Sequence, residues 1–112
     1  MRAISVGKNL TAATATTLYT VPTGYYAKCT LLHVTNSTAS NKHISLSWYD
    51  SSLTTSIPVT FEYTISAKTN FDPITEIQNF ILEEGDYITA TSETGATISV
   101  VGTFELYGAQ RT

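Results

Sequence analysis

The chain has 112 residues, long enough for one self-contained domain; 42% are hydrophobic and only 13% charged, about half the charged share usual in soluble domains. A net charge of -3 offers no basic patch to a phosphate backbone, so we expect no nucleic-acid partner. No apolar run reaches the roughly 20 residues that span a bilayer, and the N-terminal AISVG is too short for a signal-peptide core, so we expect no membrane partner and no secretory leader.

Short apolar segments that alternate with hydroxyl residues recur along the chain, and this period of two predicts strands. In chain order, we predict strands at residues 4–7, 17–21, 26–35, 43–50, 60–66, 80–82, 86–92 and 97–107. The 26–35 segment breaks step at Leu31 and Leu32, which indicates a bulge or a strand covered on both faces. Segment 74–80 offers at most one helical turn.

The alternation also predicts which side chains face the core. The expected inward residues are Ile44, Leu46 and Trp48, then Phe61, Tyr63 and Ile65, then Ile88 and Ala90, and finally Ile98, Val100, Gly102, Phe104 and Leu106. Since Trp48 shares its side of the strand with two aliphatic residues, we expect it to be buried.

Turn-forming residues separate the strands at 22–24, 36–41, 50–56, 70–73, 83–86 and 92–95. Residues 1–112 are therefore expected to form a single antiparallel β-sandwich of about eight strands, jelly-roll-like. Residues 1–17 contain the TAATATT run, which has no large side chain to bury, so we expect an extended N-terminal arm there.

Reactive residues are few. Cys29, the single cysteine, lies in the apolar stretch KCTLLHV and is expected to be a buried small hydrophobe rather than a nucleophile. His33 and His43 sit in strand-like segments with no HxH or HExxH spacing, so we interpret them as ordinary strand histidines. We therefore expect no catalytic residues, no metal ligands and no cofactor.

Glu83, Glu84 and Asp86 surround Gly85 in ILEEGDYI and allow two interpretations. They could form a calcium site or a glycosidase carboxylate pair. We favour a tight turn in which Gly85 adopts a positive φ and Asp86 bonds to nearby backbone.

Three tyrosines are expected on outward faces of their strands, namely Tyr49, Tyr87 and Tyr107. Tyrosine is enriched at protein contacts and sugar-binding surfaces. Together with Ile4 and Val6 of the arm, these residues are the candidate interface through which copies of the chain associate.

Several motifs resemble a family of small structural proteins of tailed bacteriophages, notably marine podovirus-like phages. They are LYTVP-x-G at 18–24, TN-x-T-x-S at 35–40, a strand ending in WYD at 48–50, and ILEEGDYI at 81–88. The motifs span most of the chain, from Thr17 to about Ser92, but they also reflect the turn chemistry of β-sandwiches in general.

The resemblance implies a jelly-roll-like virion component with no catalytic residues, found in the virion after assembly in the host cytoplasm. The leading hypothesis is a homo-oligomeric capsid decoration or cement protein, most often trimeric in proteins that it resembles, with the major capsid protein as partner. The alternatives are a phage neck, tail or fiber component, or a carbohydrate-binding module.

Overall fold

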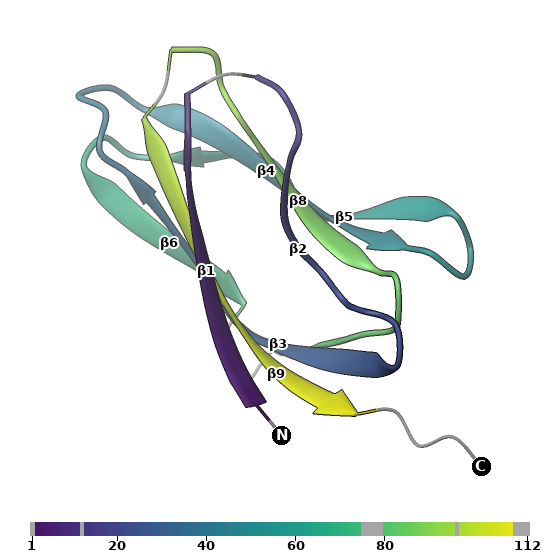
Figure 1. Cartoon of the computed structure of the whole chain (residues 1–112). Helices are drawn as coiled ribbons and strands as arrows, with labels where there is room; N and C mark the ends of the chain where they lie inside the picture. Colours follow the sequence, from purple (N-terminus) through teal and green to yellow (C-terminus); the bar gives the residue numbers. More distant parts are fainter. Residues whose placement is uncertain (1, 12, 75–79, 96, 109–112) are drawn as a thin grey trace.

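The computed structural model describes residues 2–11, 13–74, 80–95 and 97–108, and these residues contain strands, turns and no helix. The strands are β1 (Arg2–Leu10), β2 (Thr16–Thr20), β3 (Tyr25–Asn36), β4 (Lys42–Asp50), β5 (Thr55–Ile65), β6 (Thr69–Ile74), β7 (Phe80–Leu82), β8 (Tyr87–Ser92) and β9 (Ile98–Gly108) (Figure 1). All-β structure is thus confirmed. The helical turn considered at 74–80 falls largely outside the described residues, and no described helix is long and apolar enough to cross a membrane.

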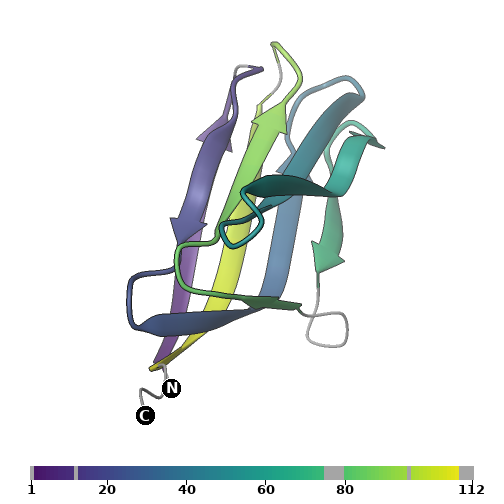
Figure 2. The ribbon, with the colours of Figure 1, turned by 90° about the vertical axis from the view of Figure 1, so that its right-hand side faces the viewer.

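Two antiparallel sheets form the sandwich. One has the order β1-β9-β3-β6, with β7 also paired to β3, and the other has the order β2-β8-β4-β5. In Figure 2 the sheet that contains β2 and β8 lies in front of the one that contains β1 and β9. Early strands pair with late ones as β1–β9, β2–β8, β3–β6 and β4–β5, and successive pairs alternate between sheets. This winding is that of a jelly roll, as the sequence predicted.

The core lies between the sheets, where the predicted alternation of β9 is confirmed. Ile98, Val100, Phe104 and Leu106 are all buried, whereas the residues between them are partly or largely exposed. Gly102 belongs to the same inward row, and a Cβ there would lie 3.0 Å from the Phe104 ring. The missing side chain therefore makes room for the largest side chain of the core.

The predictions for β4, β8 and β3 are also confirmed. The core between the sheets contains Ile44 and Leu46 of β4, and Ile88 and Ala90 of β8, all of them buried. In β3 the register with β9 shifts between Cys29 and Leu31, which is the bulge that the broken alternation indicated.

Residues 2–10, within the segment expected as an extended N-terminal arm, form strand β1 of the larger sheet. Arg2–Leu10 pairs with β9 along its whole length, from Arg2 opposite Leu106 to Leu10 opposite Ile98. Ile4 and Val6 are half-buried against the core of their own subunit. A segment with few large apolar residues is stabilised here by backbone pairing with β9, which no local pattern reveals.

In β5, the edge strand that pairs with β4, the inward assignment is confirmed for Ile65, which is buried, but it is wrong for Phe61 and Tyr63. Phe61 is 74% exposed and Tyr63 is 47% exposed. The β4–β5 register shifts on both sides of Leu46, and Glu62 has a φ of 46°, so bulges break the alternation. Tyr63 still stacks on Phe71 of the other sheet, with ring centroids 3.9 Å apart.

Burial of Phe104 generates a prediction for stability. Phe104→Ala should cost about 3–5 kcal/mol of unfolding free energy, because it empties the centre of a closed core. Ile81→Ala, at an exposed position of β7, is the control and should stay within about 0.5 kcal/mol of the wild type. Equilibrium urea unfolding measures both, and equal costs would contradict the assignment of Phe104 to the core.

Candidate functional site

The turn between β7 and β8 is built around the buried carboxylate of Asp86. Its Oδ1 accepts hydrogen bonds from the backbone N and the Oγ of Ser51, both at 2.9 Å. Its Oδ2 accepts from Trp48 Nε1 at 3.0 Å and from the backbone N of Glu83 at 2.9 Å. The carboxylate therefore joins the end of β4 and the following turn to the β7–β8 turn.

The same turn also binds the loop after β2. Val21 and the turn exchange two backbone hydrogen bonds, Val21 N to Asp86 O at 2.9 Å and Gly85 N to Val21 O at 3.1 Å. Gly24 N donates to Glu84 Oε1 at 2.6 Å. Three loops at one end of the sandwich are thus fastened to each other, with Gly85 at a φ of 85° as the turn requires.

Hydrogen bonding holds the pKa of Asp86 below its ordinary value. Burial of the carboxyl by itself would raise the pKa, but the four bonds from Ser51, Glu83 and Trp48 stabilise the ionised form and outweigh burial. Trp48 is correspondingly half-buried rather than fully buried as expected, since its indole lies against the core and its N–H reaches this carboxylate.

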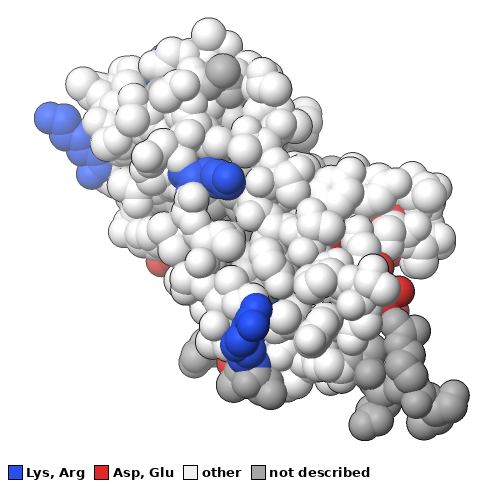
Figure 3. All heavy atoms as spheres, in the orientation of Figure 1, with Lys and Arg blue, Asp and Glu red and all other residues white. Residues whose placement is uncertain are grey.

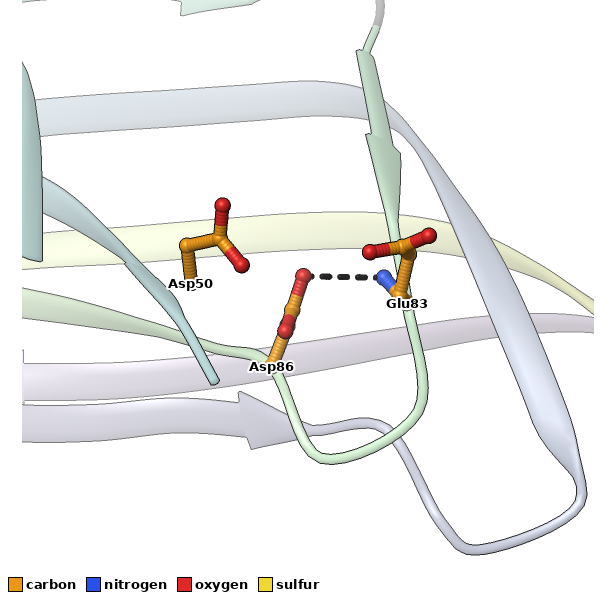
Figure 4. Close-up of side chains that lie close together, drawn as sticks. All are labelled: Asp50, Glu83 and Asp86. Atoms are coloured by element: carbon orange, nitrogen blue, oxygen red, sulfur yellow. Dashed lines mark hydrogen bonds between the residues drawn. The ribbon is translucent and has the colours of Figure 1, made fainter. Parts of the chain in front are cut away.

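The calcium interpretation of the acidic turn is disfavoured by this geometry. Oxygens of Asp50, Glu83 and Asp86 lie within 4.8 Å of one another (Figure 4). However, four donors already occupy the acceptor positions of Asp86, and Asp50 Oδ1 accepts from the N and Oγ of Ser52. The tight-turn interpretation of Gly85 and Asp86 is confirmed.

Loss of the Asp86 charge should destabilise the fold in a pH-dependent way. Asp86→Asn leaves buried donors without an acceptor, at about 1–3 kcal/mol each. Because folding lowers this pKa, the ionised carboxylate adds stability above the unfolded pKa of about 3.9 and loses it as pH falls through the folded pKa. Thermal melting should show the largest deficit of Asp86→Asn near neutral pH, narrowing in acid.

The control for that measurement is Glu105→Gln, which removes a carboxylate from a half-exposed position and keeps an oxygen that can accept from Tyr107. It should melt within error of the wild type at neutral pH. A deficit of Asp86→Asn that stays constant from neutral pH into acid would contradict the role given to the ionised carboxylate.

Chelation should leave the protein unchanged. Since Asp86 is saturated by protein donors, dialysis against EDTA should not shift the melting temperature, and added calcium should not raise it. A fall of many degrees that calcium reverses would instead make Asp50, Glu83 and Asp86 a metal site.

Both histidines have acidic neighbours that the sequence did not indicate, because the contacts join distant strands. His33 Nδ1 contacts the Asp72 carboxylate, and His33 Nε2 lies 3.3 Å from Thr35 Oγ1. These three side chains lie exposed or half-exposed on the sheet surface.

His43 lies beside Glu93, with 3.6 Å between Nε2 and Oε1. The backbone N of His43 donates to Glu93, and this bond, aided by Lys42, lowers the pKa of the carboxyl. Cys29 is fully buried, and burial raises the pKa of its thiol to about 12, so it is protonated and shielded as expected.

The candidate interface tyrosines lie on two different faces. Tyr49 of β4 and Tyr87 of β8 are cross-strand partners whose rings stack with centroids 4.6 Å apart. Tyr107 of β9 stacks on Tyr26 of β3 with ring centroids 5.2 Å apart, and its hydroxyl donates a hydrogen bond to Glu105 Oε1. Tyr49, Tyr87 and Tyr107 are each half-buried. The two stacked pairs lie on opposite sheets and therefore form no single patch.

Sequence reasoning missed a more exposed apolar group on the hairpin that joins β4 to β5. Leu53 is 66% exposed, and Ile57 and Phe61 are exposed on β5. We call these three residues the hairpin surface. Pro58 was the available signal, because proline within an apolar run indicates an edge strand.

One shallow hollow of about 260 Å³ lies elsewhere, at the end of the sandwich where β1, β3 and β9 meet. It is lined by Arg2, Pro22, Tyr25, Leu106 and Gly108.

The winding of the two sheets defines the chain as a jelly-roll protein, and its most exposed large apolar side chains, Phe61 and Leu53, lie on the β4–β5 hairpin. No protein-family profile matches the sequence, and no curated protein is similar to it. Two solved structures share the fold. A protein from endospore appendages of Bacillus, described as disulfide-linked pili, has 15% identity and a TM-score of 0.54, covering 97% of this chain and 88% of that one.

The second is the core of NLP from Drosophila, a structure described for pentamer formation and histone binding. It has 15% identity and a TM-score of 0.58, covering 90% of this chain and 97% of that one. At this identity the similarity establishes the β-sandwich fold and nothing about shared ligands.

Proposed function

We propose that this protein is a non-enzymatic structural protein of a tailed-phage virion, acting as a homo-oligomeric capsid decoration or cement protein. The observation that carries the self-associating role is the hairpin surface, where Leu53 and Phe61 are 66% and 74% exposed. Large apolar side chains left in water at the tip and edge of a hairpin are typical of a surface that a protein partner covers.

The phage assignment rests on the motifs at 18–24, 35–40, 48–50 and 81–88. Three of the four motifs lie together around Asp86: segment 18–24, the WYD strand end and the 81–88 turn. Asp86 bonds to Trp48 and Ser51, and backbone bonds join Val21 to the 81–88 turn. Their physical role is thus to fasten one end of the jelly roll.

Both similar structures come from proteins described as assemblies, pili in one case and pentamers in the other. This supports self-association as the use of the fold. Disulfide linkage, as in the pili, is not open to Cys29, because that thiol is fully buried and is the single cysteine of the chain. Association is therefore noncovalent, through side chains on the surface.

Immunogold labelling of virions from the encoding phage tests the proposal, with sedimentation velocity of the purified chain beside it. We expect label on the head and a closed oligomer, for which a trimer is the expectation from the resemblance. Label on the neck, tail or fibers would replace the decoration role by the first alternative. Virions without label would overturn the virion assignment.

A glycan array separates the carbohydrate-binding alternative. Decoration predicts no glycan binding by the wild-type chain. Binding that Tyr49→Ala abolishes, and that Tyr107→Ala on the opposite sheet leaves intact, would favour a sugar-binding module built on the Tyr49–Tyr87 pair.

A further inference from the structure

The two long edges of the sandwich have complementary surfaces. At one edge, β1 lies beside β2, and at the other, β5 lies beside β6. Alternate residues of β1 share one side of the strand, so Arg2 and Lys8 flank the half-buried Ile4 and Val6. We call these four residues the β1 row.

The hairpin surface at the other edge lies beside an acidic residue. Phe61 and Ile57 are exposed on β5, and the neighbouring Glu62 is also exposed. In Figure 3 basic side chains stand over β1 and a further one projects at the far left, while acidic atoms appear at the lower left and at the right.

The charges of the β1 row oppose pairing of two β1 strands. An antiparallel pairing of β1 with β1 of a second copy that is centred on Ser5 would place each Arg2 opposite Lys8 of the other copy. Like charges directly opposite each other are destabilising in a ladder. This register of a two-fold contact through β1 is therefore disfavoured, whereas an acidic partner is favoured.

The edge of β5 is equally unsuited to adding a strand. Pro58 has no backbone N–H to donate, the register with β4 shifts on both sides of Leu46, and Glu62 has a φ of 46°. A partner must therefore bind this edge through side chains. The exposed Phe61 ring is the side chain best placed to do so.

On the basis of these charges and of the exposed apolar side chains, we propose that the hairpin surface of one copy binds the β1 row of the next copy. Phe61 and Ile57 cover Ile4 and Val6, and Glu62 lies beside Lys8. The proposal rests on the self-association in the proposed function and specifies its geometry. Because the two surfaces differ, the contact is head-to-tail, and repetition closes a ring or continues as a filament.

Sedimentation velocity of the full chain over a concentration series tests the apolar part of the contact. Phe61→Ser should raise the dissociation constant about tenfold or more, because buried aromatic anchors carry much of the binding free energy. Ile81→Ser is the matched control, since Ile81 is 46% exposed on β7, away from both surfaces, and should leave assembly unchanged. Equal effects of the two variants would overturn the proposal.

Charge exchange tests the partner surfaces. Lys8→Glu and Glu62→Lys should each weaken assembly, because each places like charges at the contact. The double variant, and an equimolar mixture of the two single variants, should recover assembly. Assembly of the wild type should also weaken as salt is raised. Failure of both forms of recovery would overturn the pairing of these surfaces.

The outcomes separate this inference from the proposed function. A wild type that labels the virion head and assembles, but ignores Phe61→Ser and both charge reversals, overturns the head-to-tail contact and leaves the decoration role standing. If the protein is absent from virions but its assembly responds to these substitutions as described, the decoration role is overturned and the head-to-tail contact stands. A species that stops at a dimer, or a chain that is monomeric at high micromolar concentration, overturns the head-to-tail contact.

Discussion

The carboxylate of Asp86 is the interaction on which one end of this jelly roll depends. A β-sandwich leaves its loops at the ends, where no sheet hydrogen bonds hold them, and here two other loops are bonded to the turn that carries this buried charge, one of them through the carboxylate itself. Burying a carboxylate costs free energy unless its acceptor positions are filled. Four protein donors fill them, so the group that would otherwise weaken the core fixes the position of the turns.

The constrained end around Asp86 differs from the exposed β4–β5 hairpin beside it. Residues near Asp86 are constrained by one another, including Trp48, whose indole divides its contacts between the core and the carboxylate. The β4–β5 hairpin begins just beyond Ser51, and there the exposed Leu53 and Phe61 have no comparable anchor within the described part of the chain. A rigid end beside an exposed apolar hairpin suits a subunit that binds its partner through that hairpin.

The sequence predicted the central strands well and the edges poorly. β9 and β8 each pair with a strand on both sides, so their register is fixed and alternation of Ile, Val and Thr maps directly onto inside and outside. In β5, two bulges shift the alternation, and unlike the bulge of β3 they leave no break in the pattern of apolar residues. For β1, the partner strand is almost the whole chain away, so no local pattern predicts the pairing.

The candidate site shows the same division. Gly85 and Asp86 were identified as a turn from local chemistry alone, and that turn is confirmed. Trp48 and Ser51 as partners of Asp86, and Asp72 and Glu93 as neighbours of the histidines, depend on how distant strands align. The hairpin surface was missed for a related reason, because Phe61 was assigned to the core by an alternation that the bulges interrupt.

Pairing of the first strand with the last has a consequence for how the protein is made. Among the strands of this sandwich β1 is synthesised before the others and its partner β9 after them, so β1 stays without its sheet partner while the strands between them are made. Folding dominated by such distant contacts is slow, and unpaired strands from neighbouring nascent chains can meet during that interval. Arg2 and Lys8 put two positive charges on this strand, and charges on an unpaired strand disfavour its pairing with another copy.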